Sequence, residues 1–171
     1  WIKVSINGGD AETYAKIHQT KKPDEFERVL ANMGRAVKSA EEMGSSISIG
    51  GQIVALPQVE QTLKKSLVVR QNPENIHTIL PLGRRLKELG VHYYVVKPYS
   101  QHMFSTDEVG AYGQTSYKDA GAWAGEVEQL SGDGFNVVVR WKTMQAWEQG
   151  PDRGYGICHA TPYAWAYLEA A

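Results

Sequence analysis

Cysteine is nearly absent from this chain: Cys158 is the only one among 171 residues. A single thiol cannot close an intrachain disulfide, and it cannot supply the several thiolates that hold a closed cysteine metal site. The sequence therefore excludes a disulfide-stabilised fold. It also excludes a multi-cysteine metal centre built from these residues alone.

The sequence also lacks an excess of charge and a long apolar run. Its 18 Lys and Arg balance 19 Asp and Glu, with no like-charged block that would indicate nucleic acid or an anionic membrane surface. No apolar run approaches the roughly 20 residues that cross a bilayer, and the N-terminus lacks the pattern of a signal peptide. We expect a soluble, cytoplasmic protein that binds small molecules, with no nucleic-acid or membrane partner.

Neither end of the chain resembles a natural terminus. The chain begins directly in a strand-like run without an initiator Met, and it ends in the apolar, alanine-rich segment 163–171. Its length and its 42% hydrophobic residues are sufficient for one domain with its own core. We therefore expect one domain or part of one, cut from a longer polypeptide.

What the chain does contain is an alternation of strand-like and helix-like runs. Such alternation is typical of parallel sheets, so the predicted fold class is α/β, made of (β/α) units with parallel strands and right-handed crossovers. The predicted strands amount to roughly half of a barrel. They cover residues 1–6, 47–56, 91–96 and 135–141.

Helices are predicted between these strands from the spacing of apolar residues and from the capping residues. Asp10 is a suitable N-cap for a short helix. The Gly50-Gly51 pair inside the second strand indicates a bulge or a close backbone approach. The segments without a clear strand pattern are predicted as helices over 24–44, 76–90 and 120–130, and as loops over 100–114 and 145–156. Segment 58–70 is ambiguous, and its apolar spacing of four residues slightly favours a helix over an irregular loop.

Polar residues gather where the strand 91–96 ends, in the sequence Lys97-Pro98-Tyr99. In parallel α/β folds ligands bind at the carboxyl ends of the strands. Lys97 and Tyr99 are two residues apart on an extended chain, so both can face one pocket, while Pro98 restrains the backbone. The alternative is a lysine at a strand end that reaches solvent.

A second polar pair follows the first strand, where Ser5 and Asn7 alternate with apolar neighbours. Both side chains can therefore share one face and offer a hydroxyl and an amide to a polar ligand. The alternative is that they bond to the adjacent turn. Residues 7–10, Asn-Gly-Gly-Asp, are too short for a nucleotide-binding glycine fingerprint.

Other candidate residues are isolated. His18, Arg28 and His102 are suited to bind a carboxylate or a phosphate, although such residues more often serve surfaces or packing. Cys158 with His159 admits three interpretations: a small buried residue, a nucleophile with its base, or one ligand of a metal cluster completed elsewhere. Adjacent side chains on a strand diverge, which disfavours the nucleophile. No catalytic residue is assigned.

Several segments together resemble a known family. Residues 4–18, Val-Ser-Ile-Asn-Gly-Gly-Asp-Ala-Glu-Thr-Tyr-Ala-Lys-Ile-His, followed by 26–30, resemble the middle of radical S-adenosylmethionine (radical SAM) enzymes. Leu89-Gly90, the strand end at 97–100 and residues 158–165, Cys-His-Ala-Thr-Pro-Tyr-Ala-Trp, are similar to the subgroup with a C-terminal SPASM or twitch extension.

The resemblance implies a fold and a set of site residues. Residues 1–150 would form the second half of a partial (β/α)6 TIM-like barrel, and 151–171 would begin the C-terminal extension. It implies that Ser5 and Asn7 contact S-adenosylmethionine, and that Lys97 and Tyr99 contribute to the same cofactor or substrate site. Cys158 would be a metal ligand of an auxiliary iron–sulfur cluster. The list of implied cofactor-binding residues is therefore Ser5, Asn7, Lys97 and Tyr99.

The chain departs from the family in one respect, because it lacks the Cys-x3-Cys-x2-Cys loop that holds the [4Fe–4S] cluster. We therefore expect a fragment of an enzyme whose N-terminal cluster-binding region is missing, inactive by itself, with an unidentified small-molecule or peptide substrate. The alternative is a non-catalytic small-molecule binding module with a strand-end pocket. A third possibility is an unrelated (β/α) barrel enzyme.

Overall fold

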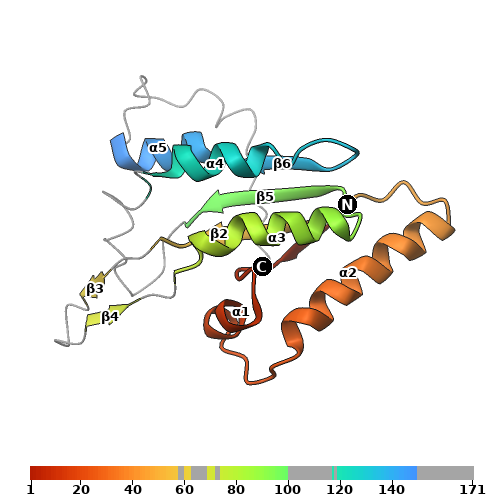
Figure 1. Ribbon diagram of the computed structural model, residues 1–171, viewed down its shortest axis with the longest axis horizontal. Coiled ribbons are helices and arrows are strands. Elements are labelled where there is room, and N and C mark those ends of the chain that lie inside the picture. Colours follow the sequence, from red (N-terminus) through yellow and green to blue (C-terminus); the bar gives the residue numbers. More distant parts are fainter. Residues whose placement is uncertain (58–59, 63–68, 72–73, 100–116, 118, 150–171) are drawn as a thin grey trace, which may run out of the picture.

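The computed structural model describes residues 1–57, 60–62, 69–71, 74–99, 117 and 119–149 (Figure 1). These residues form an α/β structure around a 4-stranded sheet, so the predicted fold class of parallel (β/α) units is confirmed. The elements in chain order are β1 (Ile2–Ser5), α1 (Ala11–His18), α2 (Glu25–Glu42), β2 (Ile49–Ala55), β3 (Glu60–Thr62), β4 (Val69–Gln71), α3 (Ile76–Glu88), β5 (Tyr93–Pro98), α4 (Ala120–Glu128), β6 (Asn136–Val139) and α5 (Trp141–Gln149).

The main sheet has the strand order β1-β2-β5-β6, and all of its pairs are parallel. Strands β3 and β4 pair antiparallel in a separate sheet. Within the main sheet, each strand lies next to the one that precedes it in the chain, so the order runs in one direction across the sheet.

Helix α3 packs against one face of this sheet, and Figure 1 shows it lying across β2 and β5. A Cβ atom at Gly51 of β2 would lie 2.6 Å from Leu86 Cδ1 of α3. The Tyr94 side chain of β5 is fully buried, its hydroxyl donates to the Ile79 carbonyl oxygen at 3.1 Å, and its burial raises its pKa well above the usual value. The core therefore lies between this face and the helices, and includes Ile6, Phe26, Leu30, Met33, Ile53, Leu82, Val96, Val127 and Met144.

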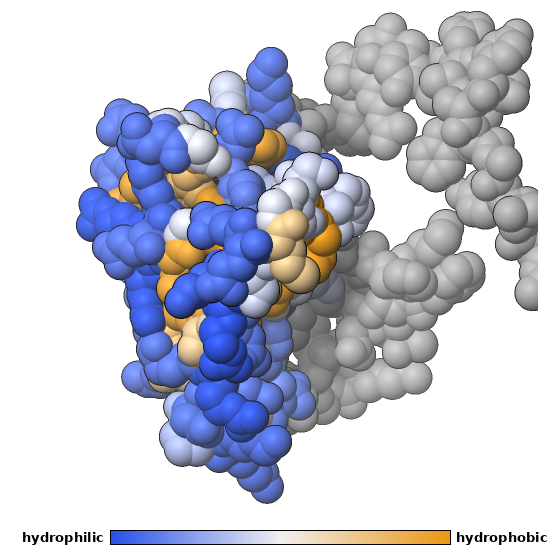
Figure 2. Space-filling model, turned by 90° about the vertical axis from the view of Figure 1, so that its right-hand side faces the viewer, coloured by the Kyte–Doolittle hydropathy of each residue, from blue (hydrophilic) through white to orange (hydrophobic). Residues whose placement is uncertain are grey.

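The surface of the molecule is mostly polar on the side shown in Figure 2. Figure 2 looks onto the side from which β5 starts in Figure 1, and that side is mostly hydrophilic with small, separate hydrophobic patches. Among the described residues, the large hydrophobic side chains that remain exposed are few: Trp1, Ile2, Met43 and Val138. No helix in the described ranges has both the length and the apolar character needed to cross a membrane.

Most of the predicted elements are present near their expected positions. Asp10 caps α1, as predicted, by accepting a hydrogen bond from the Thr13 N–H at 2.8 Å. Helix α2 ends just before Gly44, which has the left-handed φ of 61° that favours glycine. The strand register runs without interruption through Gly50 and Gly51, so the close backbone approach is confirmed and the bulge is not.

Two predictions were wrong. The helix over 58–70 is contradicted, because β3 and β4 are strands in which Thr62 pairs with Val69. An apolar spacing of four residues favours a helix, whereas the β-branched Thr62 and Val69 and the antiparallel pairing favour strands. The loop predicted from Gln145 is contradicted by α5, which buries Met144 completely and so gains a packed face. The loop predicted over 100–114 lies outside the described residues.

The contact at Gly50 predicts a large cost of substitution. A Cβ atom there would overlap the Tyr93 carbonyl oxygen and ring, and backbone atoms of a sheet cannot move away easily. We expect Gly50→Ala to lower the free energy of unfolding by about 1–3 kcal/mol in a chemical denaturation experiment.

Gly121→Ala is the matched control, because no atom lies within 4 Å of a Cβ at this position in α4. This variant is expected to gain about 0.5–1 kcal/mol from the better helix propensity of alanine. Equal effects of the two substitutions would contradict the close approach at Gly50.

Candidate ligand site at the carboxyl edge of the sheet

The second face of the main sheet is polar. Paired residues of a parallel sheet point to the same side, and the register pairs Ser5 with Gln52 and Lys3 with Gly50. The residues Gly51 and Tyr94, which pack against α3, alternate with these and so point the opposite way. We call this second side the polar face; it carries Lys3, Ser5, Gly50, Gln52, Val54, Tyr93, Val95, Lys97, Asn136, Val138 and, beyond β6, Arg140.

A polar face is unusual for a parallel sheet, because strands of such sheets are normally buried by apolar residues on both sides. The polar face includes a hydroxyl, two amides, a phenol and three cations, and it includes no Asp or Glu. These groups would cost stability if apolar chain covered them without hydrogen bonds. The polar face is therefore the candidate ligand site.

Gln52 lies in the middle of this face and was missed by the sequence analysis. Only 8% of the residue is exposed, and its side-chain amide makes no hydrogen bond within the part of the chain that the structure describes. A buried amide without a partner costs about 1–3 kcal/mol. The sequence offered one sign of this role, because Gln52 is the only polar side chain within residues 49–55.

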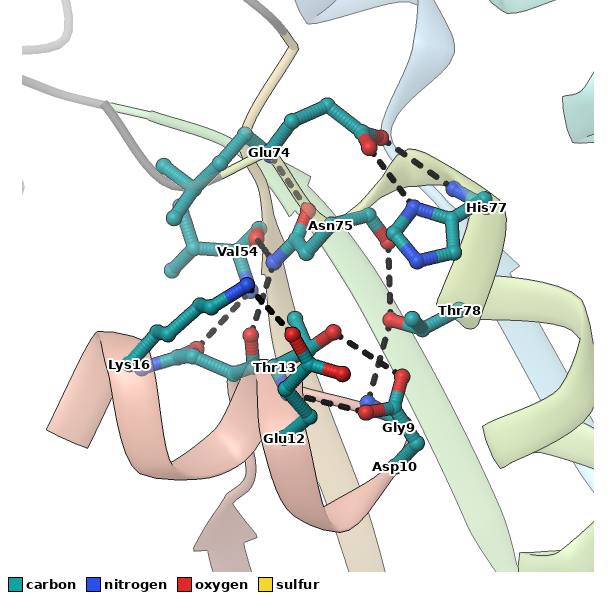
Figure 3. A network of polar contacts seen from close by, with 12 residues as sticks. Gly9, Asp10, Glu12, Thr13, Lys16, Val54, Glu74, Asn75, His77 and Thr78 are labelled. Carbon is teal, nitrogen blue, oxygen red and sulfur yellow. Dashed lines mark hydrogen bonds and ion pairs between the residues drawn. The ribbon is translucent and has the colours of Figure 1, made fainter. Parts of the chain in front are cut away.

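At the carboxyl edge of the sheet, one buried side chain joins two strand ends (Figure 3). Asn75 is fully buried, and its Nδ2 donates to the carbonyl oxygens of Asn7 and Val54, both at 2.8 Å. Its Oδ1 accepts from the Leu56 N–H at 2.7 Å. The ends of β1 and β2 and the start of α3 are thus held together through Asn75. The sequence analysis also missed this residue.

The turn after β1 is fixed by the same group of contacts. The Gly9 N–H donates to Thr78 Oγ1 at 3.0 Å, and that hydroxyl donates to the Asn75 carbonyl oxygen at 2.8 Å. Burial by itself would raise the pKa of Asp10, but hydrogen bonds from Thr13 outweigh this effect, and the pKa is held below its usual value. The carboxylate therefore stays charged and keeps α1 capped.

The two residues predicted at the end of the first strand, Ser5 and Asn7, have different surroundings. Asn7 Oδ1 accepts a hydrogen bond from the Val54 N–H at 3.1 Å, so this oxygen serves the fold and the Nδ2 group is the part that can donate to a ligand. Ser5 is exposed on the polar face beside Gln52, and its hydroxyl bonds to no other residue described in the structure. Ser5 therefore lies beside Gln52, and its side chain makes no hydrogen bond to the turn at residues 7–10.

Lys97 and Tyr99 continue β5 at the same edge. Lys97 is half-buried on the polar face and pairs in register with Val54. The Tyr99 N–H donates to the Tyr117 hydroxyl at 2.9 Å, and that hydroxyl donates to the Ala55 carbonyl oxygen at 2.9 Å. Tyr117 thereby joins the end of β5 to the end of β2. Alternation along β5 places Lys97 on the polar face, while Tyr99 follows the last residue of the strand.

The remaining candidates have other surroundings or lie outside the described residues. His18 stacks on Tyr14 with 4.2 Å between ring centroids, and its Nε2 accepts a hydrogen bond from the Asn7 N–H at 3.2 Å. Arg28 is exposed on α2, 3.9 Å from Asp24. His102 and Cys158 lie outside the described residues. No group of three or more His, Cys, Asp or Glu that could hold a metal occurs in the described ranges.

Comparisons of the chain with known protein families, with curated proteins and with solved structures found no match. The chemistry of the polar face and of the strand ends is therefore the basis for assigning a function.

Removal of the Asn75 side chain should destabilise the fold strongly. Asn75→Ala leaves two carbonyl oxygens and one N–H without partners at a buried edge. We expect the free energy of unfolding to fall by about 3 kcal/mol in urea denaturation. Asn32→Ala, on the exposed surface of α2, is the control and should change it by less than about 0.5 kcal/mol. A similar small change in both variants would rule out Asn75 as the joint between the strands.

His18 predicts a pH dependence of stability. Its pKa is lowered from 6.5 by burial, an effect that Glu25 partly offsets, and its neutral Nε2 accepts the Asn7 N–H. Because the folded-state pKa lies below the unfolded value, the unfolded chain binds more protons between the two. The free energy of unfolding should therefore be highest above about pH 6.5 and decrease as the pH falls from there toward the folded-state pKa.

Denaturation at a series of pH values between about 5 and 8 measures this dependence. His18→Gln should remove the His18 part of the slope, while His77→Gln, which changes an exposed histidine beside Glu74, should retain it. An unchanged slope in His18→Gln would show that another group is responsible.

Proposed function

We propose that this chain is the second half of a partial (β/α)6 barrel in a radical S-adenosylmethionine enzyme, and that the polar face lines the interior of that barrel. Two observations support the barrel. The strand order β1-β2-β5-β6 continues in one direction, as in a barrel, and α3 packs on the opposite face, which would be the outside. A polar interior near the carboxyl ends of the strands is where barrel enzymes bind their ligands.

The described residues fit the polar parts of S-adenosylmethionine. Its ribose hydroxyls, amino group and carboxylate need hydrogen-bond donors and acceptors, which Ser5, Gln52 and the Nδ2 group of Asn7 can supply. The observation that carries the proposal is the buried amide of Gln52 beside the exposed hydroxyl of Ser5. A polar ligand there would satisfy an amide that otherwise lacks a partner.

The described residues do not fit the [4Fe–4S] cluster, because no group of metal ligands occurs among them. In this proposal the missing N-terminal region holds that cluster, and Cys158 in the extension 151–171 is an auxiliary ligand. In the family that the sequence resembles, S-adenosylmethionine at the cluster is the source of a radical that starts chemistry on the substrate. We assign no catalytic residue in this chain.

The role of this chain is then to bind and orient. Ser5 and Gln52 position the cofactor, and the Asn75 hydrogen bonds hold the Asn7 backbone, just after β1, against the end of β2. A site supported by buried hydrogen bonds holds its geometry better than one on unsupported loops. The closed barrel would exclude water from the reacting groups.

The same face would also serve a non-catalytic module for a small polar ligand. The hydrogen-bonding groups of Ser5 and Gln52 favour this second candidate, because they can bind a ligand without any metal. The two candidates differ in the full-length protein, since the module binds its ligand in air and without iron, whereas the enzyme cleaves S-adenosylmethionine only with its cluster in the absence of oxygen.

Ser5→Ala tests the cofactor site. In the full-length protein with its cluster reconstituted, the lost hydrogen bond should weaken S-adenosylmethionine binding by about 1 kcal/mol, or about fivefold in Kd, measured by equilibrium titration. Ser39→Ala changes an exposed serine on α2 and should leave the Kd unchanged. If Ser5→Ala binds as tightly as this control, Ser5 does not contact the cofactor.

A further inference from the structure

Two cations lie side by side at the carboxyl edge of the polar face, in Lys97 and Arg140. Lys97 alternates along β5 with the buried Val96, and Arg140 follows the buried Val139 of β6. Val96 and Val139 pair in register, and the Arg140 N–H continues the ladder by donating to the Val96 carbonyl oxygen at 2.9 Å. The next residues on the two strands, Lys97 and Arg140, are therefore neighbours about 5 Å apart along the sheet.

Neither cation is neutralised by the described residues. Lys97 and Arg140 form no ion pair within these ranges, whereas Lys87 and Arg85 on α3 each have a carboxylate partner. The polar face contributes no Asp or Glu, although acidic residues slightly outnumber basic ones in the whole chain. Like charges on adjacent strands repel, and half-burial of Lys97 adds a desolvation cost. Among the described residues, the pair is therefore left with a repulsion that a bound anion would relieve.

We propose that Lys97 and Arg140 form a subsite for an anionic group of the substrate, a carboxylate or a phosphate. Arg140 can bind either group through two parallel N–H bonds, and Lys97 supplies a compact second charge. The carboxylate or phosphate would approach from the carboxyl edge of the sheet, where ligands of parallel sheets bind.

The position of the pair assigns the anion to the substrate. Ser5 is on the edge strand β1, whereas Lys97 is on β5 and Arg140 directly follows β6, the strand at the opposite edge of the sheet. Neighbouring strands lie about 4.8 Å apart, so Ser5 and the cation pair are separated by about 10 Å or more. This assignment rests on the proposed function, while the anion subsite itself does not.

The test uses the full-length protein with inorganic phosphate and with acetate as probes. Each replaces chloride at constant ionic strength, and the melting temperature Tm is followed because a ligand of the folded state raises it. Phosphate also stabilises proteins in general. Lys97→Gln and Arg140→Gln are therefore compared with Arg84→Gln, which removes an equal charge from the exposed surface of α3.

We expect wild type and Arg84→Gln to show an additional, saturable rise in Tm with at least one probe. The apparent Kd should be about tenfold or more weaker in each subsite variant, because a charge-assisted hydrogen bond is lost. In chloride alone, these two variants should melt at the same temperature as wild type or higher, since the repulsion is removed. The probe with the lower Kd identifies the anion as phosphate or carboxylate.

Two outcomes would overturn the subsite. Equal Tm rises in all four proteins would show that the cations bind no anion. Loss of S-adenosylmethionine binding in Lys97→Gln or Arg140→Gln, with phosphate and acetate responses unchanged, would assign the cations to the carboxylate of the cofactor. Failure of the wild type to bind S-adenosylmethionine would contradict the proposed function alone, because the probe measurements do not need the cofactor.

Discussion

The hydrogen bonds of the Asn75 side chain are the interaction on which the rest of the site depends. One buried amide satisfies the carbonyl oxygens of Asn7 and Val54 and the N–H of Leu56, groups that belong to the ends of two strands. Without it these groups would be buried and unpaired at the edge where ligands bind in parallel sheets. Ser5 and Gln52 pair in the β1–β2 register just before this joint, which holds the two strand ends together beyond them.

The two faces of the main sheet differ in their structural roles. One packs against α3 and holds the core, including Tyr94, while the other presents polar groups in register across the strands. In the proposed barrel, the face packed against α3 would be the outside and the polar face the inside. The polar face is divided into a hydroxyl–amide part at Ser5 and Gln52 and a cationic part at Lys97 and Arg140.

Features that depend on neighbouring residues in the chain were predicted from the sequence, whereas features that depend on tertiary contacts were missed. The cap at Asp10 and the helix α2 follow from spacing and residue type within one segment, and both were confirmed. The strands β3 and β4 were mistaken for a helix because their pairing is invisible in apolar spacing. Asn75 and Gln52 were missed because hydrogen-bond satisfaction is a property of the folded chain: Asn75 bonds to a residue 68 positions away, and Gln52 finds no partner at all within the described residues.

The central claim, that the polar face presents buried groups to a ligand, is tested most directly by Gln52→Leu in the full-length protein. Both the free energy of unfolding and the Kd for S-adenosylmethionine with the reconstituted cluster would be measured. If the amide has no partner in the protein, an apolar side chain of similar size should leave the stability equal or higher, and cofactor binding should weaken. Reduced stability together with an unchanged Kd would show that the amide serves the fold, and would contradict the account.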